Sequence, residues 1–338
     1  MTNERDPIER ASAGSLDLYD VSTWEERSSL DGLSVAIWNL ATTVFRVAIV
    51  LVALLLLVGI GGLTMFSTPE VGVLTALSVI PALALAGYVY YSDVTSNEPL
   101  SLLVATFLLG VLTANFAALV NSVLNPYFQL LPIVGSVLFF FLVVGPVEET
   151  VKLLAVRLYA YRSDRFNAVI DGAVYGAMAG LGFATIENAL YITQGVEPAQ
   201  LEFGLELIGV GGEITAVRAL AGPGHVIYSA FAGYYLGLAK FNSENGGPII
   251  VKGLLIAAFI HATYNTTVGV GSGLVWLFMQ TVVPFSVPQL VAYLGYVILY
   301  DGFFGYLLYR KIKRYRNTYW AVHDDETVRD ESAVKKST

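Results

Sequence analysis

The chain has 338 residues, of which 55% are hydrophobic and only 14% are charged, whereas a soluble domain carries about a quarter charged residues. The net charge of −8 comes largely from the ends, because residues 1–34 hold eight acidic side chains against three arginines and residues 317–338 hold five against three basic ones. This composition excludes a soluble globular protein, and the acidic balance argues against nucleic acid as a partner.

Long apolar runs recur from Val35 to Leu308, and a helix needs about 20 such residues to cross the hydrocarbon layer. Because the runs are continuous and lack the alternation of a membrane β-strand, we predict an all-α, polytopic transmembrane helical bundle of about eight transmembrane helices. The predicted helices are residues 36–65, 71–91, 100–122, 133–161, 168–193, 214–240, 249–271 and 289–312. Residues 273–286 are too short to span, so they are predicted to form a re-entrant or interfacial piece.

Polar flanks divide the chain into three parts. Residues 1–34 are predicted to be an acidic cytoplasmic tail, 35–316 the transmembrane domain and 317–338 an acidic, disordered tail. Lys and Arg gather at the fourth-to-fifth and sixth-to-seventh connections and after the last helix, whereas the alternate connections have none. The positive-inside rule then places both termini in the cytoplasm, in a protein of the cell (plasma) membrane.

The stretch GPVEETVKLL (145–154) puts two adjacent carboxylates in the middle of the fourth predicted helix. Ionisable groups at this depth cost a few kcal/mol and indicate function. At about 1.5 Å per residue, His225 and His261 fall at the same depth in the sixth and seventh helices. Asn265 follows one turn after His261, on the same face. The residues predicted to form one catalytic site are Glu148, Glu149, His225, His261 and Asn265.

Other polar residues are predicted to support this site, although each also has a structural interpretation. Lys152 could simply neutralise one glutamate as a helical ion pair. Glu187-Asn188 could form a structural hydrogen bond or belong to the site, and Asp171 and Arg218 lie near helix ends, where they are expected to anchor packing. The predicted supporting set is Lys152, Glu187, Asn188 and Arg218.

Small residues and prolines surround these polar groups. Residues 172–180 carry three glycines spaced by four, which predicts a close-packing stripe on the fifth helix. Residues 222–224, Gly-Pro-Gly, precede His225 and are expected to loosen the sixth helix beside a water-bearing cavity. Pro146 should free a backbone carbonyl and open room for water beside Glu148.

The chemistry of the set favours hydrolysis of a peptide bond inside the membrane. A buried carboxylate is suited to act as general base on water, and a histidine or an asparagine amide can hold the oxyanion that forms. The chain has no cysteine, and it shows neither GxSxG nor HExxH. Glu148, His225 and His261 could still bind zinc, because three N/O ligands plus water make an open catalytic site. The predicted mechanism nevertheless uses no cofactor.

Two other classes of protein remain open at this point. Buried Glu, Lys and His also suit a proton- or cation-coupled transporter, although a conduction path would string them along the membrane normal rather than cluster them at one depth. A catalytically inactive scaffold that binds membrane partners predicts that Glu148→Gln leaves function intact.

Four stretches between residues 145 and 265 resemble the PrsW family of intramembrane proteases, which is distantly related to the CAAX prenyl endopeptidase and bacteriocin-processing group. They occur in the order of the family's motifs: EETVK (148–152), DGAVYGAMAGLGFATIENALY (171–191), RALAGPGHVIYSAFAGYYLGLAK (218–240) and KGLLIAAFIHATYN (252–265). The resemblance implies a glutamic-type endopeptidase in the lipid bilayer, whose partner is a membrane-anchored protein substrate such as a membrane-bound regulator.

The resemblance also implies roles for single residues. One glutamate of the pair at 148–149 would activate water, and His225 and His261 match the two motif histidines that orient the water and stabilise the oxyanion. Asn265 matches the polar residue after the second histidine. Glu187-Asn188 matches FxxxEN, where the CAAX relatives carry histidine, so the role of Glu187 stays open.

Overall fold

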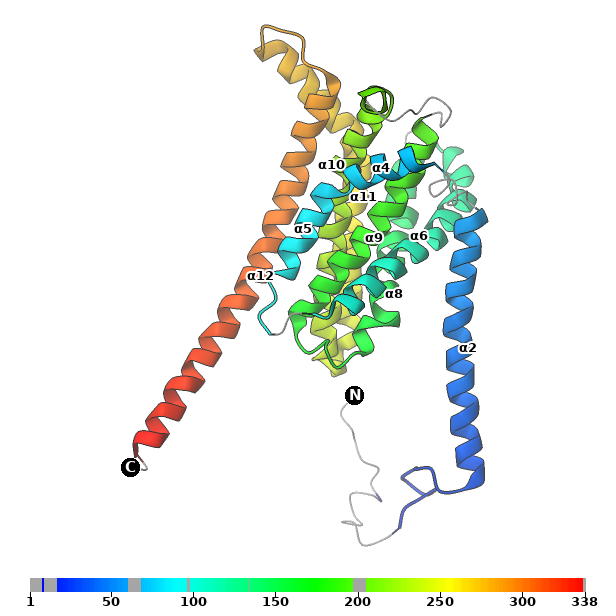
Figure 1. The fold of residues 1–338 in the computed structure, drawn as a ribbon, viewed down its shortest axis with the longest axis vertical. Helices are drawn as coiled ribbons and strands as arrows, with labels where there is room; N and C mark the ends of the chain where they lie inside the picture. The colour runs from blue at the N-terminus through cyan, green and yellow to red at the C-terminus, as the bar shows by residue number, and fades with distance from the viewer. Residues whose placement is uncertain are drawn as a thin grey trace.

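The computed structural model describes Ile8 and residues 17–59, 68–95, 98–132, 134–196 and 205–336. The described chain is a bundle of helices (Figure 1). Its elements are α2 (Ser29–Gly59), α4 (Pro69–Ser78), α5 (Ile80–Tyr90), α6 (Leu100–Gln129), α7 (Val134–Phe139), the π-helix η1 (Phe140–Val144), α8 (Gly145–Leu158), the 3-10 turn η2 (Ala160–Arg162), α9 (Val169–Gly195), α10 (Leu205–Lys240), the 3-10 turn η4 (Ser243–Asn245), α11 (Gly246–Val282) and α12 (Gln289–Lys336).

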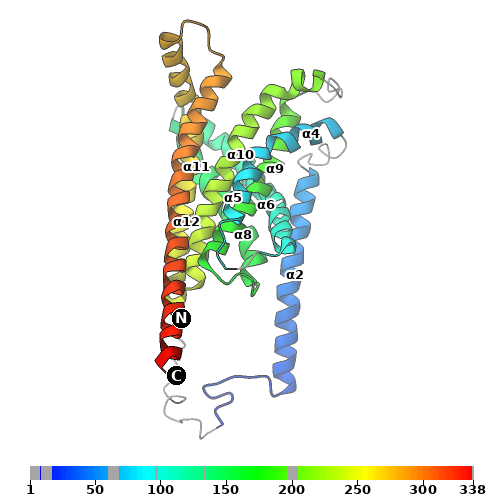
Figure 2. The same cartoon turned by 60° about the vertical axis from the view of Figure 1, so that its left-hand side comes forward.

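Helix α9 lies at the centre of the bundle. In the most apolar 18-residue stretch of α9, 83% of the residues are buried, against 12% in the corresponding stretch of α2. Helices α4, α5, α6, α8 and α10 pack against α9, while α2 and α12 stand on opposite sides of the molecule (Figures 1 and 2). Three of the four helices that carry the predicted motif residues, α8, α9 and α10, therefore pack together at the centre.

Glycines bring α9 and α10 into backbone contact. A Cβ added at Gly172, Gly176 or Gly180 would lie 2.1, 2.2 or 2.4 Å from a carbonyl oxygen of α10. Such distances are far below van der Waals contact, so only glycine permits this approach. The predicted close-packing stripe is confirmed, and it holds His225 of α10 against α9.

The prediction of an all-helical, multi-pass membrane protein is confirmed, but the number of spans differs. Among the described helices, five are long and apolar enough to cross a membrane, or six if the bent pair α4–α5 is one span. The sequence predicted about eight. The predicted fourth span is split by η1, which leaves 14 residues for α8, and α10 carries Pro223, His225 and several charged residues that lower its hydropathy.

Three other local expectations need correction. Residues 273–282 are not a separate re-entrant piece, because α11 continues to Val282 and ends before Pro284. Helix α10 continues through Pro223 without interruption, so the sixth helix is not broken there. Helix α12 extends to Lys336 and thus through most of the segment expected to be a tail.

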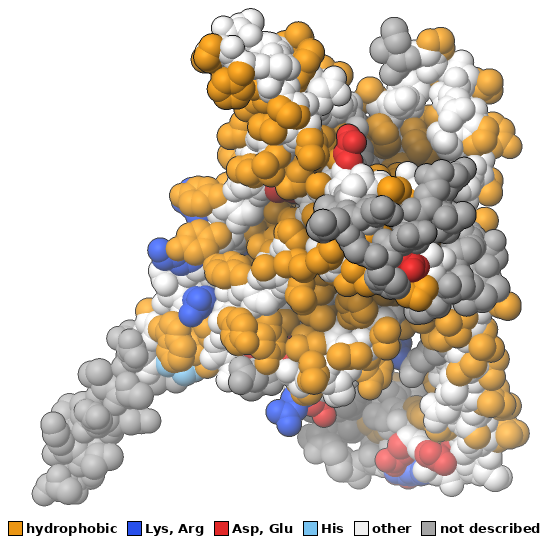
Figure 3. Space-filling model, turned by 45° about the horizontal axis from the view of Figure 1, so that its top comes forward, with side chains coloured by type: hydrophobic (Ala, Val, Ile, Leu, Met, Phe, Trp, Pro, Cys, Tyr) orange, Lys and Arg blue, Asp and Glu red, His pale blue; other side chains and the backbone are white. Residues whose placement is uncertain are grey.

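Apolar side chains cover much of the face shown in Figure 3. Large exposed hydrophobic residues are typical of α2, α11 and α12, and Leu255 and Phe259 of α11 are 65% and 59% exposed. A soluble protein rarely exposes so extensive an apolar surface. The bundle therefore presents a surface suited to contact with lipid.

Candidate active site

The site begins at an irregular turn of helix. The five residues of η1 precede α8, and Pro146 lies in the first turn of α8. Proline lacks the N–H that would complete the preceding turn, and such π-helical turns are frequent at functional sites. A Cβ at Gly145 would lie 2.7 Å from the Ala258 carbonyl oxygen, so glycine also lets α8 approach α11 here. The expected disturbance at Pro146 thus takes the form of a π-helix.

Glu149 is fully engaged by neighbouring side chains. Its Oε1 lies 2.7 Å from Lys152 Nζ and 2.9 Å from His261 Nδ1. All three side chains are buried, and the Lys152 ammonium also lies 4.2 Å from the centre of the Phe183 ring. Buried charges are stable only when paired in this way, so Glu149 holds Lys152 and His261 in place.

Only one carboxylate oxygen of Glu148 accepts a hydrogen bond from the described residues. Its Oε1 accepts a hydrogen bond of 3.1 Å from Asn121 Nδ2. Its Oε2 lies 3.7 Å from His261 Nε2 and 3.9 Å from Lys152 Nζ, which is too long for a hydrogen bond. Among the described residues this buried oxygen has no hydrogen-bond partner. The two adjacent glutamates therefore differ in their surroundings.

His225 links the glutamate pair on α8 to Glu187 on α9. Its Nδ1 lies 2.9 Å from Lys152 Nζ, and its Nε2 lies 2.9 Å from Glu187 Oε2. Because an ammonium can only donate, Nδ1 is the acceptor and Nε2 carries the proton toward Glu187. The ring also meets His261 edge to face, with 5.3 Å between the centroids.

The pair Glu187-Asn188 has two different roles. Glu187 contacts His225 and forms an ion pair with Arg218. Asn188 is buried, accepts a 2.9 Å hydrogen bond from Arg218 Nε and donates to Ser78 Oγ at 3.0 Å. Glu187 therefore belongs with the polar cluster, whereas Asn188 and Arg218 join α9 and α10 to α4.

A polar cavity of about 460 Å³ opens onto this cluster. Its walls come from α6, α7, η1, α8, α9, α10 and α11, and Asn265, one of the predicted site residues, lies among them. Glu149 and Lys152 lie behind the wall rather than in it. The polar residues of the lining are Asn115, Asn121, Ser122, Asn125, Glu148, Glu187, Gln194, Arg218, His225, His261 and Asn265.

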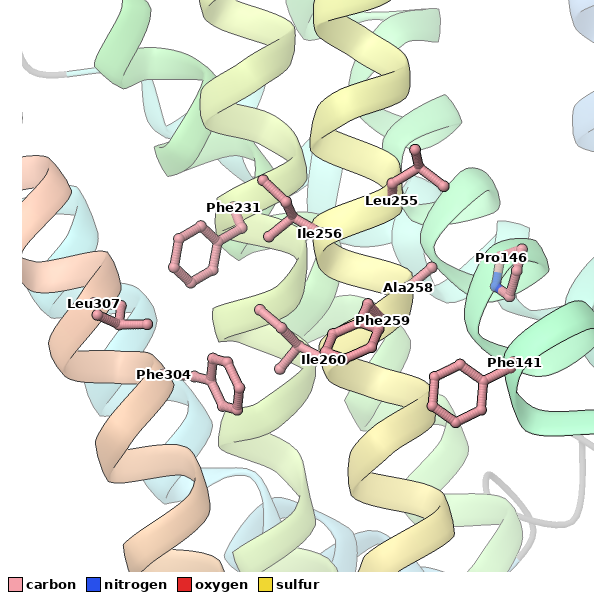
Figure 4. A pocket seen from close by; sticks show the side chains of 10 residues that line it. All are labelled: Phe141, Pro146, Phe231, Leu255, Ile256, Ala258, Phe259, Ile260, Phe304 and Leu307. Atoms are coloured by element: carbon pink, nitrogen blue, oxygen red, sulfur yellow. The ribbon is translucent and has the colours of Figure 1, made fainter. Parts of the chain in front are cut away.

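A second, apolar groove of about 560 Å³ lies along α11. Figure 4 shows Phe141 and Pro146 on one side of α11 and Phe304 and Leu307 of α12 on the other. No ionisable side chain of the described residues lines this groove. It offers no chemistry, so the polar cavity is the candidate site.

Sequence reasoning missed Asn121. It lies 27 residues before Glu148, on α6, and no motif marks it. The available signal was an asparagine late in the third apolar run, because polar groups at membrane depth indicate function. The same rule would have selected Asn115, which also lines the cavity. Asn125, another lining residue, lies beyond the predicted end of that helix.

The cluster also fits a metal ion. Glu148, His225 and His261 each offer a ligand atom, and these atoms lie within 4.8 Å of one another. The Nδ1–H of His261 donates a hydrogen bond to the Glu149 carboxylate. This arrangement leaves Nε2 available to bind a metal, as in carboxylate–histidine–zinc sites. His225 would have to exchange one of its present contacts, with Lys152 or Glu187, for the metal.

The fold and this cluster define a multi-pass helical membrane protein with a buried carboxylate–histidine site. Residues 98–294 match the model of a family described as PrsW family intramembrane metalloprotease. The chain therefore belongs to the PrsW family, and the protein is a peptide-bond hydrolase. The description names a metalloprotease, in contrast to the glutamic type expected from the sequence.

Three bacterial proteins named Protease PrsW illustrate the similarity. The chain is 32% identical to that of Bacillus subtilis (strain 168) over 191 residues, which are 55% of this chain and 78% of the relative. The values for Geobacillus kaustophilus are 33% over 193 residues, 57% and 78%, and those for Halalkalibacterium halodurans are 31% over 217 residues, 63% and 89%. No solved structure matches the chain.

Proposed function

We propose that the protein hydrolyses a peptide bond of a membrane-anchored protein substrate at the polar cavity, with Glu148 as the residue that activates water. The observation that carries this proposal is the free, buried Oε2 of Glu148, a residue of the cavity wall, which lies 3.7 Å from His261 Nε2. A water molecule between these two atoms can donate a hydrogen bond to each of them.

The proposed reaction needs one group that accepts a proton from water and one group that donates a hydrogen bond to the oxyanion. Glu148 takes a proton from water as the water oxygen attacks the carbonyl carbon. The electron pair of the C=O bond then moves onto the carbonyl oxygen, which becomes the oxyanion. The Asn265 amide, in the wall of the same cavity, donates to that oxyanion. When the C–N bond breaks, Glu148 returns its proton to the leaving amine.

The remaining polar residues position the reacting groups. Glu149 fixes His261 by accepting from its Nδ1, so that Nε2 faces the water. His225 contacts both Lys152 and Glu187. Its contact with the Lys152 ammonium holds that group away from Glu148. Glu149 and His225 are therefore proposed as positioning residues, which act on the reaction through Glu148 and His261.

Zinc chemistry is the second candidate mechanism, and the ligand set Glu148, His225 and His261 favours it. A bound zinc ion would polarise the scissile carbonyl and generate a nucleophilic water at neutral pH. Glu148 would then be a metal ligand. Glu187, which contacts His225, would be the carboxylate left to accept a proton. A transporter, by contrast, is no longer favoured, because the family is one of proteases.

The test is cleavage by the purified protein in liposomes, with a panel of single-span substrates. Wild type and the exposed-carboxylate control Glu244→Gln should cut the same substrate. Glu148→Gln, His261→Ala and Asn265→Ala should each lose about 10²-fold or more in rate. If the wild type cuts no member of the panel, or if all three variants cut normally, the proposal fails. Complete inhibition by a chelator that zinc reverses would assign the zinc mechanism.

A further inference from the structure

A second group of carboxylates lies away from the active-site cavity, where the connection from α5 to α6 meets the first turn of α9 (Figure 1). It comprises Asp93, Glu98 and Asp171, and one oxygen of each lies within 4.8 Å of those of the other two. Glu98 and Asp171 are 3% and 0% exposed, and Asp93 is half-buried. The three side chains thus converge at one end of the bundle.

Each carboxylate has one oxygen that is held by protein donors. Asp93 Oδ1 accepts from the N–H and the hydroxyl of Thr95, both at 3.1 Å. Glu98 Oε2 accepts from the Tyr175 hydroxyl. Asp171 Oδ2 accepts from two backbone N–H groups ahead of α9, at 2.7 and 2.8 Å. These bonds fix the orientation of all three carboxylates.

The second oxygen of each carboxylate is buried and unpaired. Asp93 Oδ2, Glu98 Oε1 and Asp171 Oδ1 have no hydrogen-bond partner within the described part of the chain. The nearby Lys240 ammonium donates instead to the backbone carbonyl groups of residues 161 and 163, at 2.9 and 3.4 Å. Buried carboxylates without a basic partner are costly unless they take up a proton or coordinate a metal.

We propose that Asp93, Glu98 and Asp171 bind a divalent cation, and that Ca²⁺ is the preferred ion. An all-oxygen donor set selects hard cations. Three carboxylates favour Ca²⁺, because Mg²⁺ dehydrates reluctantly and usually takes only one or two. The half-buried Asp93 leaves the ion a path from water. The bound ion ties the α5–α6 connection to the start of α9, the central helix that carries Glu187.

The test uses the full-length protein in detergent, stripped with a chelator and then titrated with Ca²⁺, Mg²⁺ or Tb³⁺. Millimolar Ca²⁺ should raise the apparent melting temperature by about 2 °C or more, and Mg²⁺ should raise it less. Tb³⁺ should give luminescence excited through Tyr175, whose hydroxyl contacts Glu98, and Ca²⁺ should displace it.

Asp93→Asn and Glu98→Gln should each abolish both responses, whereas Glu244→Gln, an exposed carboxylate in the α10–α11 connection, should keep them. Asp93 is at the rim of the cluster, so its variant is expected to fold even if a buried one does not. The proposal is wrong if the wild type responds to neither Ca²⁺ nor Tb³⁺, or if Asp93→Asn responds like the wild type. A response to Mg²⁺ equal to or larger than that to Ca²⁺ would overturn the choice of ion.

Discussion

Two adjacent glutamates in the same helix have different neighbours, and we therefore propose separate tasks for them. The 100° that separates consecutive residues of a helix turns Glu148 to the cavity and Glu149 to Lys152 and His261. The sequence showed that both could not face the same water, but it could not choose between them, since Lys152 lies one turn from each. The choice depends on contacts with α6 and α11, which no local pattern encodes.

The buried pair Glu149–Lys152 gives a prediction for stability. Lys152→Met leaves the buried Glu149 carboxylate with hydrogen bonds to His261 and Ser229 only. The free energy of unfolding should therefore fall by about 3 kcal/mol, and the apparent melting temperature should fall with it. The double variant Glu149→Leu with Lys152→Met removes both charges and should recover most of the loss. Lys252→Met, at an exposed lysine, serves as the control in thermal unfolding. A double variant as unstable as Lys152→Met would refute the pairing.

Asn121 gives a prediction for catalysis. Its amide holds Glu148 Oε1 at 3.1 Å, so Asn121→Ala should let the carboxylate rotate and lower kcat about tenfold or more. KM and the apparent melting temperature should change little. Asn125→Ala is the matched control, because Asn125 lines the same cavity, whereas the hydrogen bond to Glu148 in the described part of the chain comes from Asn121. Equal losses in both variants would mean that Asn121 acts only through the polarity of the cavity.

At the scale of elements, the contact between α9 and α10 positions the site. Gly176→Ala would place a Cβ 2.2 Å from the Ser229 carbonyl oxygen, and relieving that clash should cost about 1–3 kcal/mol. Separation of the helices would also move His225 away from Glu187, so cleavage should fall together with the melting temperature. Gly87→Ala in α5, where no atom lies within 4 Å, should be neutral or slightly stabilising. A Gly176→Ala protein with normal stability and activity would contradict this packing.

Sequence patterns located the inner helices and most of the polar cluster. The three glycines of α9 and the histidines at matching depth follow from helical spacing alone, and that spacing is local information. Helix ends were less predictable, because α10 and α11 extend beyond the apolar runs that marked them. The ring contacts of His225 and the hydrogen bond from Asn121 depend on how the helices pack together, which one sequence does not reveal.

At the scale of the whole molecule, the connections of the bundle define two ends, and the basic residues predict which end faces the cytoplasm. The chain contains no cysteine, so a single introduced cysteine is a clean reporter. Asp164→Cys, between α8 and α9, should react with a membrane-impermeant maleimide only after the cells are permeabilised. Ser286→Cys, between α11 and α12, should react in intact cells. The reverse pattern would invert the proposed orientation.

We propose that Glu148, rather than Glu149, activates the water that cleaves the substrate. The most direct measurement is the cleavage rate of one reconstituted substrate by Glu148→Gln, with the apparent melting temperature measured on the same preparation. We predict a loss of about 10²-fold or more in rate at an unchanged or higher melting temperature, because the substitution removes a buried charge with a free oxygen. Glu149→Gln should lower both quantities. Cleavage by Glu148→Gln at the wild-type rate would contradict the claim.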